Sequence, residues 1–340
     1  MAADKKNTHA LVTAWHQGSV WLYLLWPMSL LYRFLMLLRR WCYRVGIFKS
    51  YQAPMPVIVI GNISVGGTGK TPMVIALIKA LNDAGLKPAV ISRGYGSKAP
   101  YYPYCVSPDD AANITGDEPL LIAQSCRCPV IIGADRKASI GLLIKQHNCD
   151  VVVTDDGLQH YALKRDLEIA IVDGDRLFGN GHCLPMGPLR EPITRLQSVD
   201  WVISNGVTAQ YTHHMQLTAR ELVQLKTGEQ CLAERWQANK KVHAVAGIGN
   251  PSRFFNTLRE LGFDPVEHAF ADHHHFVRSD IVFDDNLAVV MTAKDAVKIK
   301  PFATDSCWFL PVDAHLPSAL MLEVINKISG LVAAQKNKSR

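Results

Sequence analysis

A buried strand, a glycine-rich loop and a helix follow one another in the run P-VIVI-GNISVGGTGKTP-MVIALIKAL, which covers residues 56–81. The glycines of the loop allow backbone conformations and close approaches that a Cβ would block. The loop amides and the N-terminus of the helix then converge on phosphate oxygens. We therefore expect a nucleotide-phosphate site built from eight consecutive residues: Ser64, Val65, Gly66, Gly67, Thr68, Gly69, Lys70 and Thr71.

The last two residues of this loop have distinct expected roles. Lys70 reaches the β- and γ-phosphates and takes part in catalysis, and the Thr71 hydroxyl binds Mg²⁺. The strict pattern G-x4-G-K-[ST] has glycine where this chain has Ser64. A structural glycine turn and a dinucleotide-binding turn are the alternatives, and the second gives the Lys-Thr pair no role.

Short Val/Ile-rich runs alternate with helical patterns after residue 51. The expected strands are Val57–Ile60, Ala89–Ser92, Val130–Ile132, Val151–Thr154, Ile169–Val172 and Trp201–Ser204. Near-continuous apolar strands separated by helices are typical of a parallel sheet with both faces covered. The expected fold class is therefore α/β, with a P-loop NTPase-like, doubly wound parallel sheet.

A second α/β series begins near residue 242, after a polar stretch without a clear rhythm of strands and helices. Its expected elements are the strands Val242–Ala246, Ala288–Thr292 and Trp308–Pro311 and the helices Ser252–Leu261 and Ala319–Val332. The expected division is an N-terminal segment (residues 1–50), a P-loop domain (51–205), a connector or β-ribbon (206–240) and a smaller C-terminal α/β domain (241–335).

Phosphoryl transfer also needs metal ligands and a group that orients or deprotonates the acceptor. Asp155 and Asp156 directly follow the strand VVVT, so they lie at the carboxyl edge of the sheet, where such folds bind ligands. Asp117 and Glu118 precede an apolar helical run, and Arg93 follows a strand, where it can recognise phosphate. The alternatives are a turn or helix cap for each acidic pair and a surface salt bridge for Arg93.

The run FADHHHF places Asp272 beside His273, His274 and His275. Adjacent residues on a regular element do not all point at one metal. A zinc site would also need a second cluster of ligands, and none stands out in the sequence. A single histidine paired with a carboxylate as a proton relay is the functional alternative to a polar surface loop.

The N-terminal segment Val20–Leu38 is apolar and close to the roughly 20 residues that span a bilayer. Arg33 is its only charge, and Pro27 is expected to kink it. Residues 1–50 hold seven Lys or Arg residues, Lys5 and Lys6 among them, and one acid, which accounts for the whole net charge of +6. The neutral body disfavours a nucleic-acid binder, and the long, late apolar run disfavours a cleaved signal peptide. A membrane anchor and a buried helix of a soluble domain remain.

Taken together, the motifs resemble those of the tetraacyldisaccharide 4′-kinase family of lipid A assembly. The resemblance runs in order through GNISVGGTGKTP, SRGYG, GDEPLLIA, DDGLQHYALKRDLEIAIVD, PMGPLREP, GIGNPSRFF, FADHH and TAKDAVK. It implies an ATP-dependent kinase that phosphorylates the 4′-hydroxyl of tetraacyldisaccharide 1-phosphate to give lipid IVA. It also implies a location at the cytoplasmic face of a Gram-negative inner membrane, and two α/β domains joined by a two-stranded ribbon.

The resemblance further implies roles for the site residues. Asp117 is the expected base and His273 its partner, while Glu118, Asp155 and Asp156 organise Mg²⁺ and this pair. ATP and Mg²⁺ are the implied cofactors, and the lipid and the inner-membrane surface are the implied partners, with no nucleic acid and no obligate protein partner. The competing class is a switch or partition ATPase acting with a membrane protein. Relatives of that class carry a signature lysine where this chain has valine, just before the glycine pair.

Overall fold

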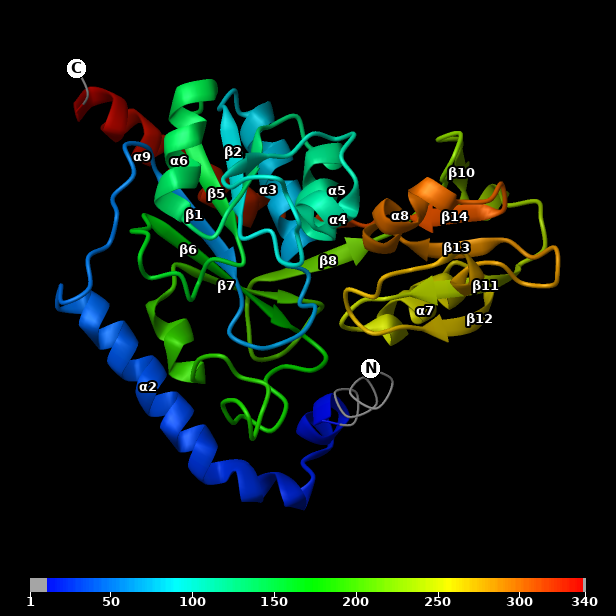
Figure 1. Ribbon diagram of the computed structural model, residues 1–340, viewed down its shortest axis with the longest axis horizontal. Helices are drawn as coiled ribbons and strands as arrows, with labels where there is room; N and C mark the ends of the chain where they lie inside the picture. The colour runs from blue at the N-terminus through cyan, green and yellow to red at the C-terminus, as the bar shows by residue number, and fades with distance from the viewer. Residues whose placement is uncertain (1–10, 339–340) are drawn as a thin grey trace.

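The computed structural model describes residues 11–338 and contains two sheets, one in each of two α/β domains (Figure 1). Lys5 and Lys6 of the basic N-terminal segment lie outside the described residues. The larger sheet has nine strands in the order β15-β8-β7-β6-β1-β5-β2-β4-β3. Its strands are β1 (Val57–Gly61), β2 (Pro88–Ser92), β3 (Tyr104–Cys105), β4 (Val130–Ile132), β5 (Val151–Asp155), β6 (Leu167–Asp173), β7 (Trp201–Asn205), β8 (His214–Thr218) and β15 (Asp313–His315).

Strand β1 forms the centre of this sheet and pairs in parallel with β5 and β6. Every residue of these three strands is buried, which matches the near-continuous apolar runs of the sequence. Both faces are covered by helices: α3 (Lys70–Asp83), α4 (Ala112–Thr115), α5 (Asp117–Ser125), α6 (Arg136–Gln146) and α9 (Ser318–Lys338). The predicted α/β class with a doubly wound parallel sheet is confirmed, and each predicted strand of this domain is present, with its bounds shifted by no more than two residues.

The smaller sheet has six strands in the order β10-β9-β14-β13-β11-β12. They are β9 (Glu221–Gln224), β10 (Gln230–Leu232), β11 (Lys241–Ala246), β12 (Asp264–Ala269), β13 (Val289–Thr292) and β14 (Cys307–Leu310), with α7 (Pro251–Glu260) and α8 (Ala293–Ile299) packed on the sheet. Strands β11 to β14 are parallel, and the β9–β10 hairpin pairs antiparallel at the edge beside β14.

The chain passes between the domains twice, once after β8 and once before β15. These two strands pair antiparallel with each other at the end of the larger sheet. Beyond β15, helix α9 packs its apolar face, including Leu320 and Val324, into the core of the larger domain. The structure departs here from the expected division, because residues 313–335, assigned to the smaller domain, pack with the larger one. The expected connector (206–240) likewise splits, with β8 in the larger sheet and β9 and β10 in the smaller.

The N-terminal segment forms a 3-10 turn, η1 (Val20–Leu25), followed by helix α2 (Trp26–Arg44). Pro27 stands in the first turn of α2, where its missing amide costs no hydrogen bond, so it starts the helix instead of kinking it as expected. Within the described residues, Val20–Arg44 is one helical stretch long and apolar enough to cross a membrane, and only 11% of its most apolar window is buried. In Figure 1, α2 lies along the outside of the larger domain.

Candidate active site

A large cavity of about 1590 Å³ lies between the two domains, at the carboxyl edge of the larger sheet. The glycine-rich loop lines it from the larger domain, and helices α7 and α8 line it from the smaller domain. Tyr32, Met36 and Arg39 of α2 also line it, so the cavity reaches from the loop to the apolar helix. Of the predicted site residues, Arg93, Glu118, Asp155, Asp156 and His273 line this cavity, together with all of residues 65–71.

The glycine-rich loop is held in a conformation that only glycine adopts easily. Gly69 has a φ of +93°, and a Cβ there would meet the Asn205 amide at 2.6 Å. Asn205 Nδ2 donates to Thr68 O at 3.1 Å, and Asn62 Nδ2 donates to Thr68 Oγ1 at 3.2 Å. Ser64 is buried beside the cavity and forms a backbone bridge with Leu189, so it supports the loop and does not line the site.

The two members of the predicted catalytic pair come from different domains. Asp117 begins α5 of the larger domain, while His273 lies on the loop after β12 of the smaller domain. The His273 Nδ1 atom lies 3.2 and 3.1 Å from the two carboxylate oxygens of Asp117. Asp117 is only 6% exposed and lies behind His273, whose ring lines the cavity. A proton taken by either group is therefore shared by the pair.

Two lysines of α8 lie beside the Asp117–His273 pair, and the sequence analysis predicted no role for either lysine. Lys294 Nζ lies 2.9 Å from Glu118, 3.1 Å from Asp272 and 3.8 Å from Asp117. Lys298 Nζ lies 3.8 Å from Asp117 and 2.8 Å from the fully buried Asp295. Lys294 thus bridges acids of both domains.

Burial alone raises the pKa of Asp117, but the hydrogen bond from His273 and the charges of Lys294 and Lys298 outweigh it and hold that pKa well below its usual range. The hydrogen bond to Asp117 raises the pKa of His273, against the opposing effects of burial and Lys294. Asp117 is therefore a carboxylate at neutral pH, surrounded by donors.

The other acidic pair stands at the end of β5. Asp156 has a left-handed backbone, with φ of +53°, and its carboxylate accepts two contacts from Arg190 Nη1 at 3.0 and 2.9 Å. Lys70 Nζ lies 3.6 Å from the same carboxylate. Burial raises the pKa of Asp156, but the nearby charges of Lys70 and Arg190 lower it below its usual value. A backbone in this sparsely populated region persists only where its surroundings hold it, and such residues concentrate at functional sites.

Asp155 differs from its neighbour in its lack of a bonded partner. Its Oδ1 atom is buried and has no hydrogen-bond partner among the described residues. Burial, together with the nearby charge of Glu118, raises its pKa. An orphaned carboxylate oxygen beside a second acid fits a divalent cation, which would supply the missing partner. Residues 11–338 contain no group of three or more acidic, His or Cys side chains that could hold a metal without further ligands. That accords with Mg²⁺, which takes one or two carboxylates plus phosphates and water.

Basic side chains line the cavity between the loop and α2. Arg39, Arg93, Arg136 and Arg190 come from four different segments, and the charges of the first three act on the nearby His160. Burial lowers the pKa of Arg136 to about 10, so it stays charged. Burial, followed by the charges of the surrounding arginines, lowers the pKa of His160 to about 4, so its ring is neutral at pH 7. This end of the cavity is suited to an anionic ligand.

The sequence analysis did not identify several residues of this site. They are Asn205, Arg136, Gln159, His160, Arg190, Arg253, Lys294 and Lys298. Arg136 and Asn205 follow strands of the larger sheet at its carboxyl edge, the same signal that identified Asp155, so that rule could have found them. Lys294 and Lys298 are spaced by four residues on one helical face, but their partners lie in another domain and no local pattern points to them.

Comparisons with known proteins identify the family of the chain. The model of the tetraacyldisaccharide-1-P 4′-kinase family matches residues 21–329. The chain is 50% identical over 306 residues to the tetraacyldisaccharide 4′-kinase of Colwellia psychrerythraea, covering 87% of this chain and 89% of that protein. It is 47% identical over 308 residues to the protein of the same name from Pseudomonas putida, covering 89% and 91% of the two chains.

A solved structure extends the comparison to the fold. The crystal structure of LpxK from Aquifex aeolicus in complex with ATP superimposes with a TM-score of 0.76 at 26% sequence identity, covering 92% of this chain and 100% of that one. The family match spans most of the chain, and the nucleotide loop lies in a cavity between the two α/β domains. The chain therefore belongs to the tetraacyldisaccharide-1-P 4′-kinase family and is an ATP-dependent kinase.

Proposed function

We propose that this kinase transfers the γ-phosphate of ATP to the 4′-hydroxyl of tetraacyldisaccharide 1-phosphate, with Mg²⁺, to form lipid IVA. The observation that carries the proposal is the continuity of the cavity, which joins the glycine-rich loop to the apolar helix α2. A lipid whose acyl chains stay in a bilayer can present its sugar to the loop only if these two features share one space.

The nucleoside occupies the part of the cavity opposite α2. There the lining comes from β8, α7 and β14, and includes Gln216 and Thr218 of β8, Phe254 of α7 and Leu310 of β14. An apolar wall with a few polar groups is typical of sites for flat, uncharged rings. The triphosphate then runs over the loop amides toward Lys70. Thr71, Asp155 and Glu118 would hold Mg²⁺, which would neutralise charge on the phosphates.

The acceptor occupies the end beside α2. Arg39, Arg93 and Arg136 surround this part of the cavity and supply charged donors for an anionic sugar phosphate. The exposed apolar side chains of α2 continue from the same end, where acyl chains of the substrate would lie in the membrane. This arrangement supports both the 1-phosphate headgroup and the acyl chains as recognition elements.

The chemical step is an in-line transfer. The 4′-oxygen forms a bond to the γ-phosphorus, the bond from that phosphorus to the β–γ bridging oxygen breaks, and ADP leaves. The hydroxyl proton passes to the Asp117–His273 pair, with Asp117 as the base. A carboxylate of low pKa is a sufficient base, because the transition state is loose and the 4′-hydroxyl loses its proton late in the transfer. Lys70 stabilises the charge on the transferring phosphate.

The membrane location follows from the same residues. Helix α2 exposes large apolar side chains such as Trp26, Phe34 and Leu38 and ends in a basic turn. We place it in the inner membrane with the folded domains on the cytoplasmic face, where ATP is available and basic flanks are retained. No obligate protein partner and no nucleic acid are part of this proposal.

The test is transfer of labelled γ-phosphate from ATP to tetraacyldisaccharide 1-phosphate in detergent micelles, with the purified full chain. Reactions contain Mg²⁺ or EDTA, and Lys70→Ala is the inactive control. Magnesium-dependent label in the lipid, lost in the control, is the expected result. Release of free phosphate without labelled lipid would overturn the proposal in favour of a switch ATPase, and label that persists in EDTA would refute the metal assignment.

A further inference from the structure

In the β5–β6 loop, residues 156–166, the carbonyl groups of three residues converge on one guanidinium group. Arg165 Nη1 donates to Leu158 O at 2.9 Å, and Nη2 donates to His160 O at 2.6 Å and to Leu163 O at 3.2 Å. Nε also donates to Leu163 O at 3.3 Å. The planar fork of Arg165 thus collects three carbonyl groups of one loop, a pattern that a lysine ammonium on a flexible stem does not reproduce.

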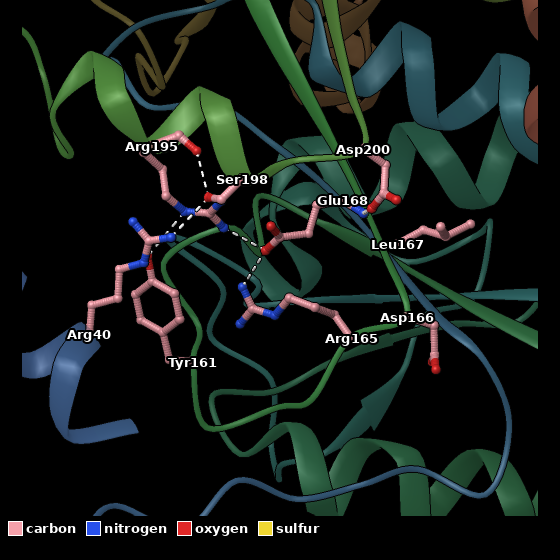
Figure 2. A pocket seen from close by; sticks show the side chains of 9 residues that line it. All are labelled: Arg40, Tyr161, Arg165, Asp166, Leu167, Glu168, Arg195, Ser198 and Asp200. Carbon is pink, nitrogen blue, oxygen red and sulfur yellow. Dashed lines mark hydrogen bonds and ion pairs between the residues drawn. The ribbon is translucent and has the colours of Figure 1, made fainter. Parts of the chain in front are cut away.

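Arg165 is itself held in place by Glu168 and Tyr161 (Figure 2). Its Nη1 lies 2.8 Å from Glu168 Oε1, at the start of β6, and the same oxygen accepts from Arg195 Nη2. Both guanidinium groups also lie over the ring of Tyr161, at 5.0 and 6.0 Å from its centroid. Arg165 and Glu168 have side chains only 13% and 10% exposed, so the pair is shielded from water and held in one geometry.

The loop separates this cluster from the catalytic cavity. Tyr161 and Arg165 line a small surface pocket of about 290 Å³ on one side, whereas Asp156, Gln159 and His160 line the cavity on the other. The loop begins at Asp156, whose backbone has a φ of +53°, and no helix or strand lies between its two ends. A loop with a strained first residue and no regular structure depends on side-chain contacts to keep one conformation.

The same cluster reaches helix α2. Arg40 Nη2 donates to Ser198 Oγ at 2.8 Å, and Arg195 Nη1 donates to the same oxygen at 2.8 Å. The ring of Tyr43, also on α2, lies 6.1 Å from that of Tyr161. A continuous set of contacts therefore links Arg40 of α2, through Ser198, Arg195 and Glu168, to Arg165 and the loop.

We propose that Arg165 is a positioning residue for the acceptor substrate. Resting on the lipid-kinase function proposed above, the inference is that Arg165, through its bond to the His160 carbonyl, fixes the β5–β6 loop so that His160 faces the acceptor end of the cavity. Gln159 is held separately, by Asn62 O and Glu191. Loss of the Arg165 fork relaxes the His160 side chain and weakens productive binding of the lipid. The phosphate loop is held by Asn62 and Asn205, which Arg165 does not contact, so we expect ATP binding to be little changed when Arg165 is replaced.

The test compares Arg165→Lys with wild type in the labelled-phosphate assay, measuring KM for the lipid, KM for ATP and kcat. Arg165→Lys keeps the charge but loses the fork. We expect KM for the lipid to rise about tenfold or more, since small misplacements of positioning groups have effects of this size. KM for ATP stays within about twofold of wild type, because Arg165 contacts no residue of the phosphate loop and positioning effects are local. Arg259→Lys, at an exposed ion pair with Glu267, is the matched control and changes neither constant.

A second step shows whether the effect passes through the loop. In a His160→Ala background, Arg165→Lys has a much smaller effect on KM for the lipid, because coupled residues are not additive. Full additivity, or an equal rise in both KM values, overturns the inference, as does a lowered Tm with unchanged kinetic constants. If Arg165→Lys does not fold, Glu168→Gln takes its place with the same readouts. Failure of wild type to label the lipid instead refutes the proposed function.

Discussion

The ring of His273 and the carboxylate of Asp117 meet across the boundary between the two domains, with Nδ1 of the ring 3.1 and 3.2 Å from the carboxylate oxygens. The proposed catalytic pair therefore exists only where the domains meet. Lys294 lies on the same boundary and contacts acids from both sides. On the other side of the cavity, Arg253 of α7 pairs with Asp173 at 3.0 Å. Assembly of the proposed catalytic pair thus requires the two domains to be in contact.

Asp117→Asn removes the base but keeps a side chain of the same shape beside His273. We expect kcat to fall by a factor of about 10² to 10⁴, the usual range for general-base catalysis, while KM for ATP changes little. Lipid transfer at saturating ATP measures the first quantity, and a titration of ATP measures the second. Turnover near the wild-type rate would falsify the assignment of Asp117 as base.

Lys298→Met breaks a buried ion pair and leaves Asp295 without its cation. Asp295 is fully buried and Lys298 is 11% exposed, so we expect a loss of about 3 kcal/mol in the free energy of unfolding. Urea unfolding of both proteins measures it. Lys226→Met, which breaks an exposed pair with Asp305, is the control and stays near wild type. Equal effects of the two substitutions would contradict the buried role of Lys298.

His160 makes stability depend on pH in a defined direction. Its pKa is about 4 in the folded chain and near 6.5 when unfolded, so between these values the unfolded state binds more protons. Wild type therefore loses stability as the pH falls from 6.5 toward 4, and His160→Gln lacks this loss. We expect the Tm of wild type minus that of the variant to decrease from pH 7.5 to pH 5. A difference that increases over that interval would show that the ring is charged in the folded protein.

The exposed face of α2 is expected to hold the enzyme on lipid. Phe34 and Leu38 are 60% and 41% exposed, and replacing both by Glu puts two charges into that face. The double variant should bind vesicles of phosphatidylethanolamine and phosphatidylglycerol much less than wild type in a co-sedimentation assay. Its activity on substrate in detergent micelles should be largely retained. Undiminished vesicle binding would mean that α2 is not the anchor.

The parallel strands were predicted well because buried β-strands leave a local signature. Val151–Asp155 and Leu167–Asp173 are buried on both faces, and a short Val/Ile-rich run between helical patterns is typical of such a strand. The glycine-rich loop was found for a similar reason, since its function depends on residues that are adjacent in sequence. Strand β12 (Asp264–Ala269) was missed, because it is an edge strand with mixed polarity and only partial burial.

Features that depend on contacts between residues far apart in the chain could not be predicted from the sequence. Helix α9 was recognised as a helix, but an apolar face does not say which of two sheets it covers, and it was assigned to the wrong domain. The fork of Arg165 binds carbonyl groups, which every residue carries, so its neighbours in the sequence hold no clue. Asp117 and His273 were paired only through the family resemblance.

The neighbouring strands β8 and β15 make the smaller domain an insertion in the larger one. The chain leaves the larger domain near Thr218 and re-enters it near Asp313, which pairs directly with Thr218. A module whose entry and exit points are adjacent can be gained, lost or exchanged without disturbing its host, and this is the usual site of tolerated insertions. The chain of the phosphate-binding half is thus complete apart from one interruption, and the half that carries His273 is connected to it through the adjacent strands β8 and β15.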